Sequence, residues 1–437
     1  METTHRPRSG ASQGKLVAAG LFAILVIAAI VWWTTAQELP VIKIPTPTLP
    51  NPNAFDTYNS AAAQLLDSSK IGYAISSRHA ASVKDDRDYS WAEKEKLISE
   101  NAPALDLLRE GLNETYVNPP ARSFNALFPY YAQHRAMARL LALESAVRAH
   151  RGDFAGAAGS ALDAVELGEE IPRGSTLIGG LVGIACQAIG RRSLLRYTDR
   201  LSGSQALAAA KRMERIRAKH VPFHETLQEE EWAGQAGLLE IMRKPNSMAA
   251  MNQAMGSPAP SLVNNPYVSQ LAYLVYSKRR IMNDYTKYMD SEIARAKLPY
   301  GTAPATKIPN DPIVQILVPV FGEARLSFVK SEAQNGLTEI SLALRAYRVQ
   351  HGSYPESLSA LAPAMLVQLP ADPFGKGGTF GYRRVGSVYV LYSVGPDGKD
   401  DGGAPIDTGK AMSTNPNERY FVKPDSKGDI VAGKNIY

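Results

Sequence analysis

The sequence has a single cysteine in 437 residues, Cys186, and this excludes a disulfide within the chain. Cys186 lies in the apolar stretch Leu177–Ile189, which reads LIGGLVGIACQAI. A thiol in such surroundings is usually packed in a core, so we expect a buried side chain rather than a nucleophile. The stretch is short for a membrane crossing and is followed by Arg191-Arg192, so it predicts a buried helix.

Several motifs of catalysis and nucleotide binding are also missing. There is no Gly-x-Ser-x-Gly elbow, His-Glu-x-x-His, P-loop or dinucleotide fingerprint. His220 and His224 have a spacing that zinc can use on a helix, but Pro222 between them disfavours one. The run Glu229–Glu231 predicts a solvated helix face rather than a general acid and base. The formal charge of +6 is not gathered in a basic block, which disfavours a nucleic-acid partner.

Charge is absent from Leu16–Trp33, which reads LVAAGLFAILVIAAIVWW. As a helix these residues would span ~27 Å, close to the hydrocarbon thickness of a bilayer. Basic residues up to Lys15 precede the stretch and Glu38 is the first charge after it, so the positive-inside rule places the N-terminus in the cytoplasm. We expect a single-pass helix at 16–36, with a cleaved signal peptide as the alternative. Either way, the remaining chain lies outside the cytoplasm.

The middle of the chain has helical periodicity. Residues 37–53 are rich in proline and predict an extended tether. From 54 to 297 apolar residues recur with helical spacing, and Gly152-Asp153 separates two of the expected helices, at 130–150 and 154–170. No unit repeats at a fixed period, so the pattern predicts an irregular helical array rather than a regular solenoid.

The C-terminal quarter combines one long helix with strands. Residues 323–350 carry apolar positions spaced three and four apart, which would cover one helix face: Val329, Ala333, Leu337, Ile340, Leu344 and Tyr347. Segments 381–384 and 387–393 predict two strands, and 420–422 a short third strand. The expected fold class is α+β, with an N-terminal transmembrane helix, a mostly helical body, and a C-terminal long helix packed on a small antiparallel sheet.

An acidic, glycine-rich segment follows the second expected strand. It reads SVGPDGKDDGGAPID from Ser393 and contains four carboxylates: Asp397, Asp400, Asp401 and Asp407. Calcium takes six to eight oxygen ligands, and glycines let a short loop turn its carbonyls inward. The spacing does not match an EF-hand. The segment therefore predicts a calcium site, with an acidic β-turn as the alternative.

The order of several short motifs in this region carries a resemblance. After the long helix come YPESL at 354–358, LPADPFG at 369–375, YVLYS at 389–393 and GPDG at 395–398. As a set, residues 323–407 resemble the soluble C-terminal part of the major pseudopilin of type II secretion. The resemblance implies the fold of that part and a calcium ion in the loop that begins at the Asp-Gly.

The same resemblance ranks the expected calcium ligands. Asp397 is the best-matched position and Asp407 the next. Asp400 and Asp401 have no counterpart in the family pattern and are included for their chemistry alone.

The chain departs from a pseudopilin in its membrane segment. The segment at 16–36 lies far upstream of the long helix, has no Gly-Phe cleavage site and carries no acidic residue in its apolar run. The overall arrangement is similar to that of a group of large bacterial envelope proteins with an anchor, a helical body and a terminal pseudopilin-like module. The expected parts are a cytoplasmic tail (1–15), a transmembrane helix (16–36), a tether (37–53), a helical body (54–297), a linker (298–322) and a pseudopilin-like module with a polar tail (323–437).

These patterns lead to two functional hypotheses. The first is a non-enzymatic protein anchored in the bacterial inner membrane. Its extracytoplasmic body would bind other envelope proteins, and its terminal module would bind calcium beside a type II secretion or pilus-like system. The alternative is an envelope enzyme such as a cell-wall hydrolase, because a catalytic site can be assembled in the helical body from residues distant in sequence.

Overall fold

The computed structural model describes residue 18 and residues 20–30, 38–76, 89–244, 277–311, 314–315, 321–375, 377–409 and 419–435. The helical elements are α2 (Ala54–Ala63), α3 (Ser68–Ser76), α4 (Trp91–Glu100), α5 (Ala102–Gly111), α6 (Tyr130–His150), α7 (Phe154–Glu170), α8 (Leu177–Tyr197), η1 (Thr198–Arg200), α9 (Gly203–Arg217), α10 (Phe223–Met242), α13 (Lys278–Ala296), α15 (Phe321–His351) and η3 (Leu358–Leu361). The strands are β1 (Gly381–Val385), β2 (Val388–Ser393) and β3 (Ile430–Val431). The α+β class is confirmed.

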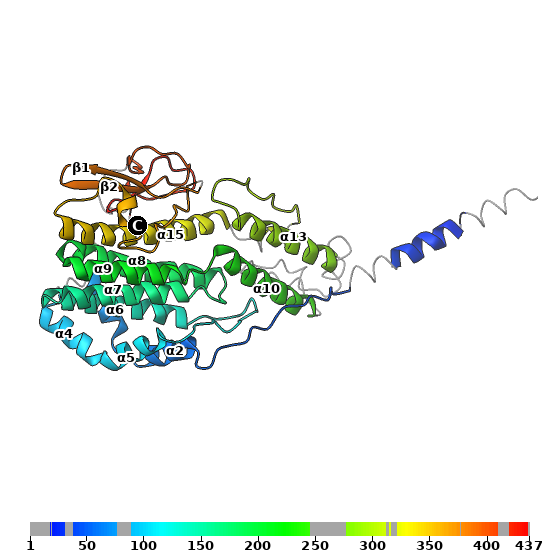
Figure 1. Cartoon of the computed structure of the whole chain (residues 1–437). Helices are drawn as coiled ribbons and strands as arrows, with labels where there is room; N and C mark the ends of the chain where they lie inside the picture. Colours follow the sequence, from blue (N-terminus) through cyan, green and yellow to red (C-terminus); the bar gives the residue numbers. More distant parts are fainter. Residues whose placement is uncertain are drawn as a thin grey trace, which may run out of the picture.

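The elements are stacked in layers (Figure 1). The small sheet lies on α15, α15 lies on α8 and α9, and these rest on α7, followed by α6 and then by α2, α4 and α5. One core cluster contains side chains from α7, α9, α15 and the sheet, including Leu162, Met213, Ile340 and Leu391. The long C-terminal helix is therefore the layer that the helical body and the sheet share.

The helix ends follow local sequence signals. Gly152 adopts a φ of 82° and turns the chain between α6 and α7, and Asp153 then caps α7 by accepting a hydrogen bond from the Gly156 amide at 2.8 Å. Ser202 and Gln205 form a reciprocal capping box at the start of α9. The bounds predicted for α6 and α7 are confirmed.

Glycines bring α7 and α8 into close contact. A Cβ atom at Gly168 would lie 2.5 Å from the Gly183 carbonyl oxygen, and one at Gly190 would lie 2.6 Å from the Ala161 carbonyl oxygen. Small residues at such crossings let the two backbones approach. Cys186 lies on this helix, is fully buried, and burial raises the pKa of its thiol to about 12. The prediction of a buried helix with a core cysteine is thus confirmed.

Helix α15 is buried on more than its apolar face. Ala333, Leu337, Ile340 and Leu344 lie in the core as the spacing predicts, with Val329 and Tyr347 partly buried beside them. Polar side chains are buried as well: Ser331, Gln334, Asn335, Thr338, Glu339 and Ser341. A purely amphipathic helix would expose such residues, so their burial needs polar partners.

Arg191 of α8 supplies several of those partners. Its guanidinium is buried and donates to Ser331 Oγ at 3.1 Å, Asn335 Oδ1 at 2.7 Å and Gln334 Oε1 at 2.9 Å. Asn335 in turn donates to Glu169 of α7 at 3.1 Å. Burial lowers the pKa of Arg191 to about 10, although the charge of Glu169 opposes this shift. A buried cation is tolerated here because acceptors surround it.

The sheet is antiparallel with strand order β1-β2-β3. Val385 pairs with Val388 across a tight turn in which Gly386 has a φ of 61°. The third strand differs from the prediction. Residues 420–422 form no strand, and Ile430–Val431 pairs with the end of β2 instead. Ile430 is fully buried, so tertiary packing determines the position of β3. A strand of two residues is too short to show alternating hydrophobicity in the sequence.

The N-terminal segment is described in part. Residues 20–30 are helical and exposed, whereas most of 1–19 and all of 31–37 lie outside the described residues. Among the residues that are described, no helix combines the length and the apolarity needed to cross a bilayer. Further on, residues 39–50 form neither helix nor strand, and Leu39 and Ile42 pack on the cluster formed by α10, α13 and α15.

Replacing Arg191 with leucine is expected to lower the free energy of unfolding by about 3 kcal/mol, because buried acceptors on α8 and α15 lose their donor. Arg196 lies on the same helix but is exposed, so Arg196→Leu should change stability by less than about 0.5 kcal/mol. Urea denaturation of the full chain measures both. Equal stability of the two variants would show that the Arg191 contacts are dispensable.

Candidate functional site

A cleft of about 330 Å³ opens among α5, α7 and α9. Its charged lining consists of three arginines and two carboxylates, with one formal positive charge in excess, and one amide and two apolar side chains complete the wall. The lining residues are Arg109, Leu112, Asn113, Asp163, Glu166, Arg212, Arg215 and Ile216.

Two helices bring opposite charges to this cleft with the same spacing. On α7, Asp163, Glu166 and Glu170 are three and four residues apart, which places them on one face. The basic residues at 212, 215 and 219 repeat this spacing on α9 and the turn that follows it. Because α7 packs against α9, the acidic and basic stripes face each other.

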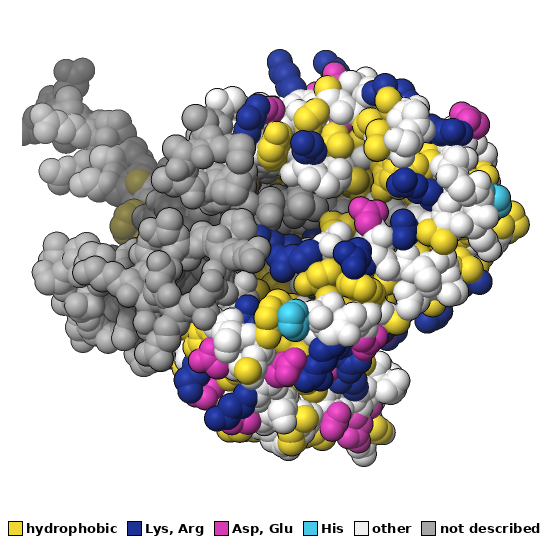
Figure 2. Space-filling model, turned by 90° about the vertical axis from the view of Figure 1, so that its left-hand side faces the viewer, with side chains coloured by type: hydrophobic (Ala, Val, Ile, Leu, Met, Phe, Trp, Pro, Cys, Tyr) yellow, Lys and Arg dark blue, Asp and Glu magenta, His cyan; other side chains and the backbone are white. Residues whose placement is uncertain are grey.

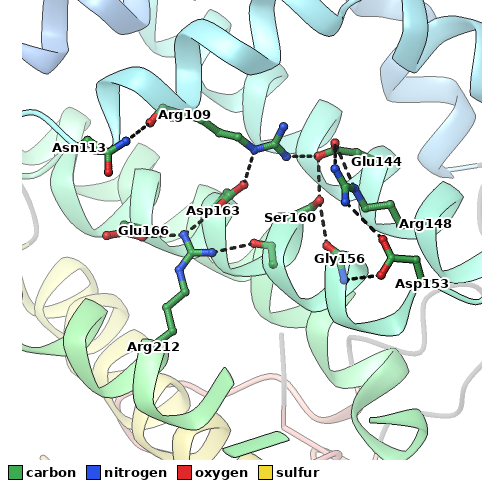
Figure 3. Close-up of polar contacts among 11 residues, drawn as sticks. Arg109, Asn113, Glu144, Arg148, Asp153, Gly156, Ser160, Asp163, Glu166 and Arg212 are labelled. Atoms are coloured by element: carbon green, nitrogen blue, oxygen red, sulfur yellow. Dashed lines mark hydrogen bonds and ion pairs between the residues drawn. The ribbon is translucent and has the colours of Figure 1, made fainter. Parts of the chain in front are cut away.

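Asp163 lies at the centre of the ion pairs (Figure 3). It accepts from Arg109 Nε at 3.0 Å and from Arg212 Nη2 at 2.6 Å. Arg212 also donates to Glu166 at 2.8 Å and to the Gly159 carbonyl oxygen at 3.2 Å. One buried carboxylate therefore fixes the guanidinium groups of two helices.

The network extends on both sides of Asp163. On one side, Glu144 of α6 bonds to Arg109, to Ser160 Oγ at 2.7 Å and to Arg148 at 3.0 Å. On the other side, the network continues along α7 to Glu166 and Glu170. There Lys219 bridges Glu166 and Glu170 at 2.8 and 2.9 Å, and Tyr58 of α2 donates to Glu170 at 2.6 Å.

The ion pairs set the protonation of these carboxylates. Burial alone would raise the pKa of Glu166, but the hydrogen bonds and charges of Lys219 and Arg212 outweigh it and hold that pKa below 4.5. Glu144 behaves in the same way: burial is opposed by the charge of Arg109 and the hydrogen bond from Ser160, and its pKa is lowered. Both groups are therefore carboxylates at neutral pH.

This chemistry suits binding better than acid–base catalysis. A general acid at neutral pH needs a raised pKa, and a general base needs an uncommitted carboxylate. Asp163 and Glu166 are instead engaged by arginine and lysine. What the cleft offers is a rigid, charged surface with hydrogen-bond donors and acceptors at fixed positions.

The four aspartates of the glycine-rich segment are not brought together around one point. Asp397 accepts from the Lys399 amide at 3.2 Å, and Asp400 accepts from Tyr392 at 2.9 Å and from the Gly402 amide. Asp407 forms an ion pair with Arg419 at 2.7 Å, which lowers its pKa. The side chain of Asp401 is exposed, and its backbone N–H donates to Asp429 Oδ1.

Three of these four aspartates are engaged by partners inside the protein: Asp397, Asp400 and Asp407. No group of three or more His, Cys, Asp or Glu side chains in the described part of the chain is placed to hold a metal. Asp407 would have to leave Arg419 before it could join the other aspartates. Calcium binding by this segment thus stays a prediction from the sequence.

Asp429 organises the segment and was missed by the sequence reasoning. It is fully buried and accepts from the Gly403 amide at 2.7 Å and the Asp401 amide at 3.4 Å. Burial raises its pKa to about 6 in spite of these hydrogen bonds. In the sequence, Asp429 stands next to Gly428 and before the apolar pair Ile430-Val431, which is typical of an acid at the start of a strand. Its hydrogen-bond partners could not be predicted, because they lie more than twenty residues upstream.

Polar side chains of α10, and His220 just before it, have partners elsewhere in the fold. Glu229–Glu231 was expected to be a solvated face, and this was wrong. Glu229 and Glu231 are buried, Glu229 pairs with Arg122 at 2.8 Å, and Glu230 accepts from the Leu177 amide at the start of α8. His220 Nδ1 lies 2.7 Å from Glu169 Oε1, so its partner is a carboxylate.

Comparison of the chain with protein-family models, curated proteins and solved structures finds no match.

Replacing Glu166 with glutamine is expected to lower stability at pH 7 by about 1–2 kcal/mol, because Arg212 and Lys219 lose a charged partner. The folded pKa of Glu166 is depressed, so its contribution is present above pH 4.5 and is lost as pH falls through the folded value. The difference between wild type and variant should therefore narrow below pH 4.5. Thermal unfolding between pH 3 and 7 measures it, with exposed Glu110→Gln as control. A difference independent of pH would contradict the ion-pair assignment.

Replacing Asp429 with alanine is expected to lower the melting temperature by about 4 °C, because the amides of Gly403 and Asp401 lose a buried acceptor. Asp397→Ala should have a much smaller effect, since Asp397 accepts from an amide of its own turn.

Repeating the thermal unfolding of wild type and variants with calcium and with chelator tests the metal prediction. A calcium-dependent rise that Asp397→Ala and Asp407→Ala both remove would establish the ion. The same melting temperature in both conditions would leave an acidic turn held by Asp429.

Proposed function

We propose that the chain is a non-enzymatic, membrane-anchored protein of the bacterial envelope whose helical body binds other envelope components. The observation that carries the proposal is the cleft between α5, α7 and α9, in which Asp163 and Glu166 are held in ion pairs. Such a surface recognises a partner by charge and hydrogen bonding, and it leaves the described cleft without a poised acid or base.

The N-terminal helix supports the anchor. The helix at residues 20–30 is apolar and exposed along its whole described length, with Leu21 at 58% and Phe22 at 69% of their full accessibility. Large apolar side chains exposed around a helix require an apolar surrounding, and a lipid bilayer supplies one. The absence of charge from Leu16–Trp33 agrees with this assignment.

The molecular surface supports protein rather than nucleic-acid partners. On the face drawn in Figure 2, basic and acidic side chains lie beside one another in the described part. A surface that binds a phosphate backbone concentrates positive charge along one stripe. Interspersed charge is typical of surfaces that discriminate between protein partners.

The C-terminal module supports a place beside a secretion or pilus-like system. Its support is the motif order from YPESL to GPDG, together with a long helix, α15, that packs on a small antiparallel sheet. The proposal does not depend on calcium, because α15 and the sheet are joined by apolar packing through residues such as Leu344 and Leu391.

Crosslinking in intact cells tests the proposed role. We expect the full chain to fractionate with the inner membrane, to resist carbonate extraction, and to crosslink to at least one other envelope protein. A variant that lacks residues 1–36 should lose the membrane fraction, because the anchor is removed. Recovery of the intact chain in the soluble fraction, or of no crosslinked envelope protein with several reagents, would contradict the proposal.

A second assay addresses the hydrolase alternative. Purified chain incubated with isolated cell wall should release no soluble fragments beyond the background of the Asp163→Asn variant. Release by wild type that Asp163→Asn abolishes would assign catalysis to the cleft and overturn the non-enzymatic proposal.

A further inference from the structure

We propose that the cleft between α5, α7 and α9 binds the end of a peptide or peptide-like chain that carries a free carboxylate. This inference rests on the proposed function, a body that binds envelope components, and names the chemical class of its ligand. It is argued from the charges that line the cleft, the donors they leave available, and the size of the space.

Arg215 is the basic residue of the cleft whose charge is not matched. It lines the cleft three residues after Arg212 and is exposed. Arg109 and Arg212 are each bound to two carboxylates, whereas no ion pair joins Arg215 to a carboxylate in the described part of the chain. A bound anion would give Arg215 the partner that its neighbours already have, and arginine binds a carboxylate through two parallel N–H donors.

Two further guanidinium groups line the same cleft as Arg215. Arg109 engages its described partners through Nε and Nη2, and Arg212 through Nη1 and Nη2. Arg109 Nη1 and Arg212 Nε have no hydrogen-bond partner within the part of the chain that the structure describes, so they remain as donors. Because the carboxylates already fix both guanidinium planes, little side-chain freedom remains to be lost when a ligand arrives.

The two carboxylates of the lining restrict the class of anion. The lining side chains carry one positive charge in excess, which matches the single charge of a carboxylate, whereas a phosphate dianion would bring two charges close to Asp163 and Glu166. The same carboxylates, together with Asn113, are acceptors for N–H groups. A ligand with a terminal carboxylate and nearby amide N–H groups satisfies both signs, and a peptide end has this composition.

The shape of the cleft agrees with a short ligand segment. Leu112 and Ile216 contribute apolar wall beside the charged groups, which suits a methyl group or a small aliphatic side chain. A space of about 330 Å³ is at the small end of ligand sites, so it accepts the last two or three residues of a chain.

Isothermal titration of the full chain in detergent tests this assignment with two probes, acetyl-trialanine as the free acid and as the C-terminal amide. We expect the acid to bind at least tenfold more tightly than the amide. Arg215→Gln should abolish this difference, because it removes the unmatched guanidinium. Arg243→Gln, which removes an exposed arginine at the end of α10, should bind as wild type does. Both variants alter exposed side chains and should retain the wild-type melting temperature.

The other outcomes are distinct. Equal binding of acid and amide, or binding of neither, would overturn carboxylate recognition. Inorganic phosphate that displaces the acid peptide at lower concentration than acetate does would assign the cleft to phosphate ligands instead. Each of these results leaves the crosslinking of the body to envelope proteins intact, so the failure of this inference is separate from the failure of the proposed function.

Discussion

The contacts of one buried guanidinium connect parts of the chain that are far apart in sequence. Arg191 of α8 donates to Gln334 of α15, and Gln334 donates through its own amide to the Asn435 carbonyl oxygen at 2.9 Å. Asn435 then holds the loop of the C-terminal module by donating to the carbonyl oxygens of Ile406 and Tyr420. A cation in a core is costly unless acceptors surround it, so this position of Arg191 requires α15 to be in place, and Gln334 links the same contacts to the C-terminal segment. The packing of α15 on α8 depends on these contacts in addition to the apolar core that α15 shares with α7 and α9.

The described body uses charge in two different ways. Around Arg191 the acceptors are mostly neutral amides and a hydroxyl, and the charged Glu169 is reached through Asn335. In the cleft, by contrast, opposite charges meet directly and are partly open to solvent. The first arrangement fixes which helices pack together. The second leaves a charged surface at the mouth of a hollow, where a partner can reach it.

Local features of the fold could be predicted from the sequence, and long-range ones could not. The limits of α6 and α7 were predicted because a Gly-Asp break separates the two helices. The apolar stripe of α15 was predicted from its spacing, but the burial of its polar face was not, because that burial depends on Arg191 about 140 residues away.

The same limit applies to the candidate site. Asp163 and Arg212 lie 49 residues apart, and their pairing follows only when α7 is known to face α9. The two stripes share a spacing of three and four residues, but a single stripe on its own is equally typical of a solvated face. In the C-terminal loop, residue type drew attention to Asp397, Asp400, Asp401 and Asp407, whereas the buried acid that binds the loop amides is Asp429.

The central position of α15 has a consequence for the order in which the molecule can be completed. Ala206, Ala210 and Met213 of α9 are buried in a cluster whose other members include Leu337 and Ile340 of α15. A ribosome adds roughly 5–20 residues per second, so the intervening hundred or so residues take about 5–20 s to appear. During that interval α7 can already pack against α9, but the part of the α9 surface that α15 covers stays exposed. A nascent chain of this kind would expose that part of α9 to chaperones and to aggregation until its last quarter emerges, and early termination after α13 would leave it without its α15 contacts.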